Sequence, residues 1–179
     1  ELCREILCEA HSIQKNAESL NKLDILTAFA FLAIQNKYVK PRFTQNPILK
    51  LKKARHPVVE KLLPVTEKFI PNDLEIDTKK NQIHLITGPN MAGKSTYLRQ
   101  VGLIIIMAQI GCFVPAEKAE IGIVDHLFTR VGASDNLAGG ESTFLVEMIE
   151  AANILNNATQ NSLILLDEVG RGTATFDGL

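Results

Sequence analysis

The amino-terminal 37 residues carry the pattern of one long helix. No Gly or Pro interrupts them, and apolar side chains recur three or four positions apart at Leu2, Ile6, Ala10, Ile13, Ala17 and Leu20. From residue 23 to residue 34 apolar side chains surround the helix, so we expect that end to be buried. Such a helix would be about 55 Å long. It is either a bundle helix or an arm that links two domains.

A proline-rich stretch follows at residues 38–77. Pro41 is expected to end the helix, and five of the seven prolines lie here, at Pro41, Pro47, Pro57, Pro64 and Pro71. Prolines at this density are typical of edge strands and turns, so the stretch indicates entry into a new domain. Its basic run is expected to be the solvated face of a strand; the run comprises Lys50, Lys52, Lys53 and Arg55.

From residue 82 the pattern becomes α/β. We predict a strand at 83–87, a Gly loop, a helix at 94–110, a strand within 121–131, a helix at 142–157 and a buried parallel strand at 162–166. The longest apolar run, 101–116, is expected to be a buried core helix, because a membrane span needs ~20 residues. The helix at 142–157 has Ser142 near its cap and an apolar stripe of Phe144, Met148, Ala152 and Leu155.

The distribution of glycine distinguishes a part of the chain that is expected to be structural from a part that is expected to bind ligands. All 11 glycines lie at or after Gly88, and glycine is needed where backbone turns tightly or approaches a ligand. The first of these loops matches GxxxxGK[ST] between a predicted strand and a predicted helix, as a phosphate-binding loop requires. Backbone N–H groups would surround phosphate, with Lys94 on the β- and γ-phosphates and Ser95 on Mg²⁺. The predicted nucleotide site comprises Gly88, Pro89, Asn90, Met91, Ala92, Gly93, Lys94, Ser95 and Thr96.

Two acids follow the last predicted strand. Asp167 and Glu168 end the run LILLDE, and the carboxyl ends of strands are where open α/β sheets bind ligands. Asp167 suits the Mg²⁺ shell. Glu168 suits orienting or deprotonating the attacking water.

Two further loops leave alternatives open. The segment 134–144, SDNLAGGESTF, is either a capped helix start or a second phosphate-facing helix end, which would favour ATP bound between two protomers. The segment 170–178, GRGTATFDG, is either a communication loop across a dimer or a polar turn.

Composition narrows the class of protein. With 46% hydrophobic and 22% charged residues and a net charge of -1, the chain reads as an ordinary soluble globular protein. It lacks the basic excess of a nucleic-acid-binding domain, so DNA contact would occur elsewhere or through a small patch. Cys3, Cys8 and Cys112 have no metal-ligand spacing and favour a reducing compartment. The scattered histidines are expected to be structural; they are His11, His56, His84 and His126. No signal peptide is visible.

Four segments resemble the ATPase domain of the MutS family of DNA mismatch-repair proteins. They read ARHPVVE at 54–60, TGPNMAGKSTYLRQ at 87–100, FTRVGASDNLAGGESTFLVEM at 128–148 and LLDEVGRGTATFDG at 165–178. The resemblance implies an α/β fold of the ABC-type P-loop ATPase kind with an incomplete sheet, preceded by a long helix. Residues 1–40 would be the helical end of the core and lever region, and 41–179 the amino-terminal part of the ATPase domain.

The same resemblance assigns roles by motif. Lys94 and Glu168 would be catalytic, and Ser95 and Asp167 would hold Mg²⁺. Ser142 would be the signature serine that reaches the γ-phosphate of the other subunit. Asn90 would help to hold phosphate, and Phe69 would pack on adenine.

The implied protein is an ATP-hydrolysing switch that controls a mismatch-recognising DNA clamp. It would pair with a second MutS-type subunit, as a homodimer or a related heterodimer. It would bind mismatched double-stranded DNA through domains outside this chain and would act with a MutL-type protein. No contact with a membrane is expected. It would be cytoplasmic, associated with a bacterial nucleoid, or nuclear. The chain begins at Glu1 and stops just after the acidic motif, so we expect a piece of a longer polypeptide.

Two other functions remain open. A transporter or chromosome-clamp ATPase of related fold would favour an LSGGQ-like loop where this chain reads LAGGESTF, and a MutS-like paralogue would differ in its other domains. A nucleotide-binding scaffold without turnover would have no physical need for Glu168.

Overall fold

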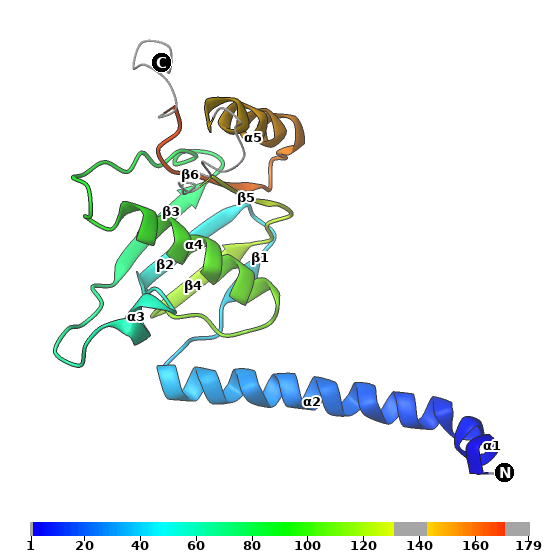
Figure 1. Ribbon diagram of the computed structural model, residues 1–179. Helices are drawn as coiled ribbons and strands as arrows, with labels where there is room; N and C mark the ends of the chain where they lie inside the picture. The colour runs from blue at the N-terminus through cyan, green and yellow to red at the C-terminus, as the bar shows by residue number, and fades with distance from the viewer. Residues whose placement is uncertain (1, 131–142, 171–179) are drawn as a thin grey trace. The chain divides into compact units, whose positions relative to one another are not determined.

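The computed structural model describes residues 2–130 and 143–170 and divides the chain into two units, Glu1–Tyr38 and Val39–Leu179. The architecture is mixed α/β preceded by a long helix. Among the described residues no helix is long and apolar enough to cross a bilayer. Figure 1 shows the elements with the labels used below.

The first unit is helical, with a break that the sequence pattern does not predict. α1 (Leu2–Cys8) and α2 (Ala10–Asn36) are separated at Glu9, whose φ of -95° and ψ of 3° leave the helical region. The N–H of Glu9 donates to the carbonyl of Ile6 at 3.1 Å, a three-residue closure that tightens the turn.

α2 ends at Asn36, five residues before Pro41, so the prediction that proline ends it is wrong. Lys37 has a left-handed φ of 54°, and the N–H of Tyr38 donates to the carbonyl of Ala33 at 2.9 Å. The N–H of Lys37 reaches the carbonyl of Ile34 at 3.5 Å. These two bonds form a Schellman closure, which supplies partners for the last helical carbonyls.

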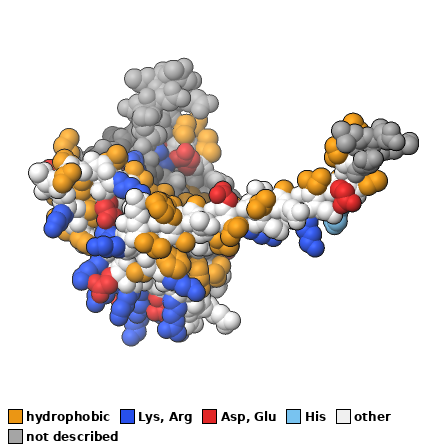
Figure 2. All heavy atoms as spheres, turned by 90° about the horizontal axis from the view of Figure 1, so that it is seen from below, with side chains coloured by type: hydrophobic (Ala, Val, Ile, Leu, Met, Phe, Trp, Pro, Cys, Tyr) orange, Lys and Arg blue, Asp and Glu red, His pale blue; other side chains and the backbone are white. Residues whose placement is uncertain are grey.

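The expected burial of residues 23–34 is also wrong. Ala33 is the one buried residue of α2, whereas Leu26, Phe31 and Ile34 are 63%, 65% and 82% exposed. Apolar side chains are visible along the helix in Figure 2. Burial requires a second apolar surface, and within this unit only the short α1 could supply one. The apolar pattern of α2 therefore shows which side chains could be buried and does not show whether a partner surface is present.

The second unit contains a four-stranded sheet in the order β1-β4-β2-β3. β1 (Arg42–Thr44) is parallel to β4 (Lys118–Gly122); β2 (Ile48–Ala54) is antiparallel to both β4 and β3 (Asn72–Asp77). A short helix, α3 (Val59–Leu62), lies between β2 and β3. Leu49 and Leu51 of β2 are buried, whereas Lys52 and Lys53 are exposed. Lys50 is half-buried, and Arg55 is half-buried and follows the strand, so the solvated strand face is confirmed for Lys52 and Lys53 only.

α4 (Lys94–Gln109) matches its predicted range to one residue and lies over this sheet (Figure 1). The helix and the sheet share the main core, whose most buried side chains are Val101, Ile104, Ile105, Val114 and Ile121. The apolar run 101–116 is not one helix, because α4 ends at Gln109 and Gly111 turns with φ of 90°. The rest of the run is loop, in which Val114 bridges to Val39.

A second, parallel pair is formed by β5 (Leu127–Arg130) and β6 (Leu163–Leu166). β6 is parallel to β5 as predicted, but it is not fully buried: Ile164 and Leu166 are 39% and 48% exposed. In the described part of the chain β5 is the one strand that pairs with β6, so the other edge of β6 has no strand partner there. Leu165 faces the core at 5% exposure.

The strand predicted at 83–87 is wrong for the described structure. These residues form no strand, and Ile83 and Leu85 are 86% and 88% exposed. A strand obtains its backbone hydrogen bonds from neighbours, and no described strand pairs with this segment.

α5 (Thr143–Asn157) confirms the predicted helix but not its predicted apolar stripe. Ala152 is exposed and Leu155 is 82% exposed, whereas Glu147 and Ile154 are buried. The helix is attached through polar groups: Glu147 accepts the N–H of Gly170 at 2.7 Å, and Glu150 pairs with Arg130 at 2.9 Å. These contacts turn the face of α5 that carries Glu147 inward, in place of the face that carries Ala152 and Leu155.

Candidate functional site: the 88–96 loop and the end of β6

The loop that precedes α4 has unusual backbone angles. Gly88, Met91 and Gly93 have φ of 154°, 64° and 92°. Gly93 adopts its left-handed angle without strain, because it has no Cβ, and it leads directly into Lys94 at the start of α4. The first N–H groups of that helix have no side-chain cap. A helix end of this kind presents donors and a positive dipole to an anion.

The Lys94 side chain folds back over its own loop. Its ammonium Nζ donates to the carbonyl oxygens of Gly88 and Pro89, both at 2.9 Å. The two carbonyls hold the cation over the loop. Phosphate oxygens could replace the carbonyls as its acceptors, with stronger charge-assisted bonds.

A cavity of about 240 Å³ opens at the loop. Glu168 lines the cavity, although this acid comes from the far end of the described chain. The other residues that line the cavity are Asn90, Met91, Gly93, Lys94, Ser95 and Thr96. Backbone turn, cation, hydroxyls and a carboxylate are therefore brought to one hollow, which fits a phosphate-bearing ligand.

The two consecutive acids have different surroundings. Asp167 is 8% exposed, and its N–H donates to the carbonyl of Arg130 at 2.7 Å, which extends the β5–β6 pairing. It is not among the residues that line the cavity. Glu168 has a left-handed φ of 55° and faces the cavity.

The predicted magnesium ligands are not a preformed metal cage. Ser95 lines the cavity and Asp167 lies at the buried end of β6. Within residues 2–130 and 143–170 no three His, Cys, Asp or Glu side chains gather as metal ligands. One hydroxyl and one carboxylate suit Mg²⁺, which commonly takes few protein ligands together with phosphate and water.

The remaining predicted residues lie away from this hollow or outside the described structure. Phe69 is half-buried between α3 and β3 and does not line the cavity. Ser142, the loop 131–142 and the segment 171–179 lie outside the described residues.

A larger hollow of about 650 Å³ lies on the outer face of the four-stranded sheet. The strand register places Arg42 opposite Glu120, Glu120 opposite Lys50, and Lys50 opposite Glu75. The last two are joined at 2.5 Å. Positive and negative side chains thus alternate across the strands. The hollow is lined by five Lys and Arg side chains and four Asp and Glu side chains, so its charges nearly balance.

Glu147 is a residue of this region that motif reading missed. Its side chain, 3% exposed, links α5 to Gly170, two residues after Glu168. The signal in the sequence is a lone acid flanked by Leu145, Val146, Met148 and Ile149. An acid among apolar residues of a helix is expected to be buried, and a buried carboxylate needs hydrogen-bond donors. The apolar residues on both sides of Glu147 therefore indicate a structural role for its side chain.

Comparison with known proteins decides the family. Residues 84–179 match the model of the family described as MutS domain V. The chain belongs to this family. The match contains three of the four segments that resemble this family, at 87–100, 128–148 and 165–178, and it begins just before the loop described above.

Relatives match over the whole chain. It is 59% identical to DNA mismatch repair protein MutS of Chlorobium chlorochromatii over 178 residues, which are 99% of this chain and 20% of that protein. The identity is also 59% to the protein of that name from Salinibacter ruber, over the full chain and 20% of the relative, and 56% to that of Caldicellulosiruptor bescii, over the full chain and 21%. The chain spans about a fifth of the length of these MutS relatives.

Proposed function

We propose that this MutS segment binds ATP with Mg²⁺ at the 88–96 loop and takes part in hydrolysing its γ-phosphate. The observation that carries the proposal is the cavity shared by Lys94 and Glu168, with the Lys94 ammonium held over the loop at 2.9 Å from two carbonyls. The fold would be that of an ABC-type P-loop ATPase. Residues 1–40 would be the end of the core and lever region and 41–179 the amino-terminal part of the ATPase domain.

Each residue has a separable role in this proposal. The backbone of the loop and the start of α4 would bind the phosphates, with Asn90 and Thr96 beside them. Lys94 would exchange its loop carbonyls for β- and γ-phosphate oxygens and offset the charge that develops in transfer. Glu168 would accept the proton of the attacking water or orient that water. Bound Mg²⁺, held by Ser95 and Asp167, would supply charge stabilisation to the phosphate oxygens.

Roles that depend on residues outside the described cavity complete the proposal. Ser142 would contact the γ-phosphate of a second MutS-type subunit, and Phe69 would pack on adenine. The names of the relatives support a protein that acts in DNA mismatch repair. The whole protein would couple nucleotide state to mismatched duplex and to a MutL-type partner, in the cytoplasm.

Two substitutions test the site in the full-length protein that carries this segment. Lys94→Ala should abolish ATP binding and turnover, because the cation on the transferred phosphate is lost. Glu168→Gln should keep ATP binding and slow turnover by roughly 10²- to 10⁴-fold, the usual contribution of a general base. Binding is measured with a fluorescent nucleotide and turnover by phosphate release.

Lys79→Ala is the matched control, because Lys79 is exposed and lies outside the cavity. It should leave both measurements unchanged. Turnover at the parent rate in Lys94→Ala would show that ATP is not hydrolysed at this loop. Parent turnover in Glu168→Gln would remove that residue's role as base.

A further inference from the structure

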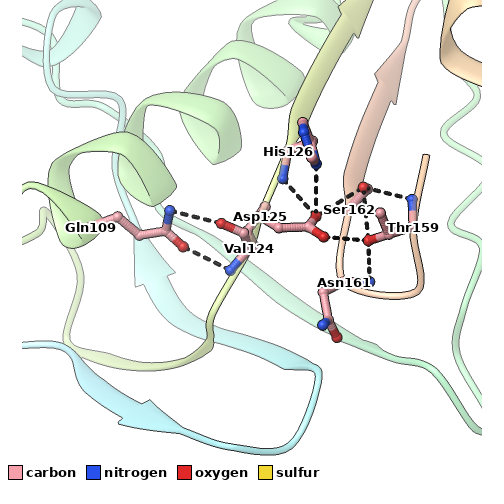
Figure 3. A network of polar contacts seen from close by, with 7 residues as sticks. All are labelled: Gln109, Val124, Asp125, His126, Thr159, Asn161 and Ser162. Carbon is pink, nitrogen blue, oxygen red and sulfur yellow. Dashed lines mark hydrogen bonds and ion pairs between the residues drawn. The ribbon is translucent and has the colours of Figure 1, made fainter. Parts of the chain in front are cut away.

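A cluster of hydrogen bonds lies where α4 ends and where β5 and β6 begin, whereas the nucleotide cavity lies at the start of α4. It joins three segments that are distant in sequence: the last turn of α4, residues 124–126 just before β5 and the turn before β6 (Figure 3). We call it the rear cluster, and its residues are Gln109, Val124, Asp125, His126, Thr159, Asn161 and Ser162. Motif reading did not select any of them as functional.

The first half of the rear cluster ties α4 to the segment just before β5. The Gln109 amide Nε2 donates to the carbonyl of Val124 at 2.9 Å, and its Oε1 accepts the N–H of Val124 at 2.7 Å. Both backbone groups of one residue are thus paired with one side chain. The two bonds together link the last helical turn to the chain that leads into β5.

The second half ties β5 to the turn that precedes β6. Asp125 Oδ2 accepts the hydroxyl of Thr159 at 2.5 Å, and Oδ1 accepts that of Ser162 at 3.0 Å and the N–H of His126 at 2.6 Å. The N–H of Thr159 also donates to the Ser162 hydroxyl at 2.9 Å. The bond from Thr159, with those from Ser162 and His126, lowers the pKa of Asp125 to about 2, so the carboxylate is an acceptor at neutral pH.

The elements run in opposite directions between the two ends. α4 begins at Lys94 beside the cavity and ends at Gln109 in the rear cluster, whereas β6 leaves the cluster and ends beside Asp167. Between these ends α4 approaches β6 closely at Gly102, where a Cβ would lie 3.1 Å from Leu165 Cδ1. A glycine has no side chain to interlock with a neighbour, so the Gly102 contact itself does not fix the position of α4 along β6. That position depends on the core side chains Val101, Ile104 and Ile105 and on the contacts at the end of the helix.

We propose that the rear cluster sets the distance between the two halves of the nucleotide site, with Gln109 and Thr159 as positioning residues. α4 has 16 residues and is about 24 Å long, and its backbone hydrogen bonds connect one end to the other. A shift along the axis at Gln109 is therefore transmitted to Lys94 and Ser95 while Asp167 and Glu168 stay with β6. The inference rests on the proposed ATP hydrolysis.

The two functions of the site should respond differently to such a shift. ATP binding relies mainly on the loop and the start of α4, which move together. Hydrolysis also requires Asp167 and Glu168 at the correct distance, and a misplacement of about 1 Å can slow an enzyme about 10²-fold. Loss of the rear cluster should therefore lower kcat and leave nucleotide affinity nearly unchanged.

The test uses the full-length protein with Gln109→Met, Thr159→Val and Thr159→Ser. The first two remove hydrogen bonds with little change of shape, and Thr159→Ser keeps the hydroxyl. We expect kcat to fall about 10-fold or more in Gln109→Met and Thr159→Val, with nucleotide Kd within about twofold. Thr159→Ser should restore kcat to within about twofold of the parent. Gln160→Met, an exposed neighbour in the same turn, is the matched control and should retain parent kcat.

The double variant Gln109→Met/Thr159→Val separates positioning from general stability. The two halves form one chain of contacts from α4 through residues 124–126 to the turn before β6. If both halves act on the same alignment of α4, the double variant should be no slower than the slower single variant. Independent losses of stability would add. Additive losses, or equal losses of binding and turnover, would overturn the positioning role.

Parent kcat in both single variants would also overturn the inference. The proposed function would survive that result if Lys94→Ala in the same preparation is inactive. Turnover in Lys94→Ala would instead defeat the proposed function, and this inference with it.

Discussion

At the scale of single residues, the end of β6 shows how backbone shape assigns different surroundings to neighbouring acids. Glu168 has φ of 55°, an angle that costs a residue with a Cβ on the order of 1–3 kcal/mol. That turn leaves Asp167 buried on the strand and Glu168 in the cavity. A buried acid suits a fixed metal ligand and an exposed one suits exchange of a proton with water, which is the division of roles proposed above.

His56 is the residue whose titration should affect stability. It is 6% exposed, and its Nδ1 accepts the N–H groups of Val58 and Val59, both at 3.2 Å, at the start of α3. Burial, and then the charge of Arg99, lower its pKa below the ordinary 6.5. Protonation would remove the acceptor lone pair that both amides use.

The sign of the pH effect follows from that shift. Above pH 6.5 the imidazole is neutral in both the folded and the unfolded chain, so it adds no pH dependence. As pH falls below 6.5 the unfolded chain takes up a proton before the folded one, and the free energy of unfolding decreases. Hydrogen-exchange protection of the Val58 and Val59 amides should therefore decrease from pH 7 to pH 5.

The substitution His56→Asn should remove much of that dependence, because the asparagine side-chain oxygen accepts hydrogen bonds and does not titrate. The matched control is His84→Asn, since His84 is exposed. Protection of the two amides that stays constant with pH in the parent would contradict the assignment.

At the scale of elements, packing is decided where two elements approach most closely. α4 contacts β6 at Gly102, where a methyl group would meet the flexible tip of Leu165 at 3.1 Å and Leu127 at 3.7 Å. An alanine needs only a small movement of Leu165 and gains up to about 1 kcal/mol of helix propensity over glycine. A valine adds two further methyl groups to the same contact.

We therefore expect Gly102→Ala to be nearly neutral and Gly102→Val to destabilise α4 docking by about 1–3 kcal/mol, the usual cost of overpacking. The change is measured as hydrogen-exchange protection of the α4 amides in the full-length protein. Ile106→Val introduces valine at a half-exposed position of the same helix and should change stability by less than about 0.5 kcal/mol. Equal effects of the two valines would show that Gly102 is not a packing contact.

At the scale of the whole molecule, the second unit places apolar segments on its surface. Residues 83–87 lead into the phosphate loop without a strand partner among the described residues, and Leu85 is 88% exposed. The chain also spans about a fifth of its MutS relatives. The loop is therefore fixed through α4 on its carboxyl side and lacks sheet hydrogen bonds on its amino side.

This predicts poor turnover by the isolated 179-residue chain. A loop that is free to shift by about 1 Å relative to Glu168 should lose about 10²-fold in rate. Phosphate release by the isolated chain, per nucleotide site, is compared with that of the full-length protein, and Lys94→Ala in each gives the background. Equal rates would show that sheet pairing of residues 83–87 is dispensable.

The sequence by itself determined the features that depend on neighbouring residues. Helix periodicity located α4 and α5, and the apolar run before two acids located β6. The GxxxxGKS spacing located the loop, because glycine, lysine and serine must stand at fixed offsets to surround one phosphate group. The family followed from the same local motifs.

Only the tertiary structure decided which of these features meet and which apolar residues are covered. Ile34 remains exposed although the pattern of residues 23–34 predicted burial, because burial depends on a partner surface elsewhere in the chain. Residues 83–87 are no strand, because pairing depends on neighbours that local pattern does not reveal. The rear cluster likewise joins Gln109, Val124 and Thr159 through hydrogen bonds across the fold, so the device proposed to align the site arises from contacts between segments and not from any one motif.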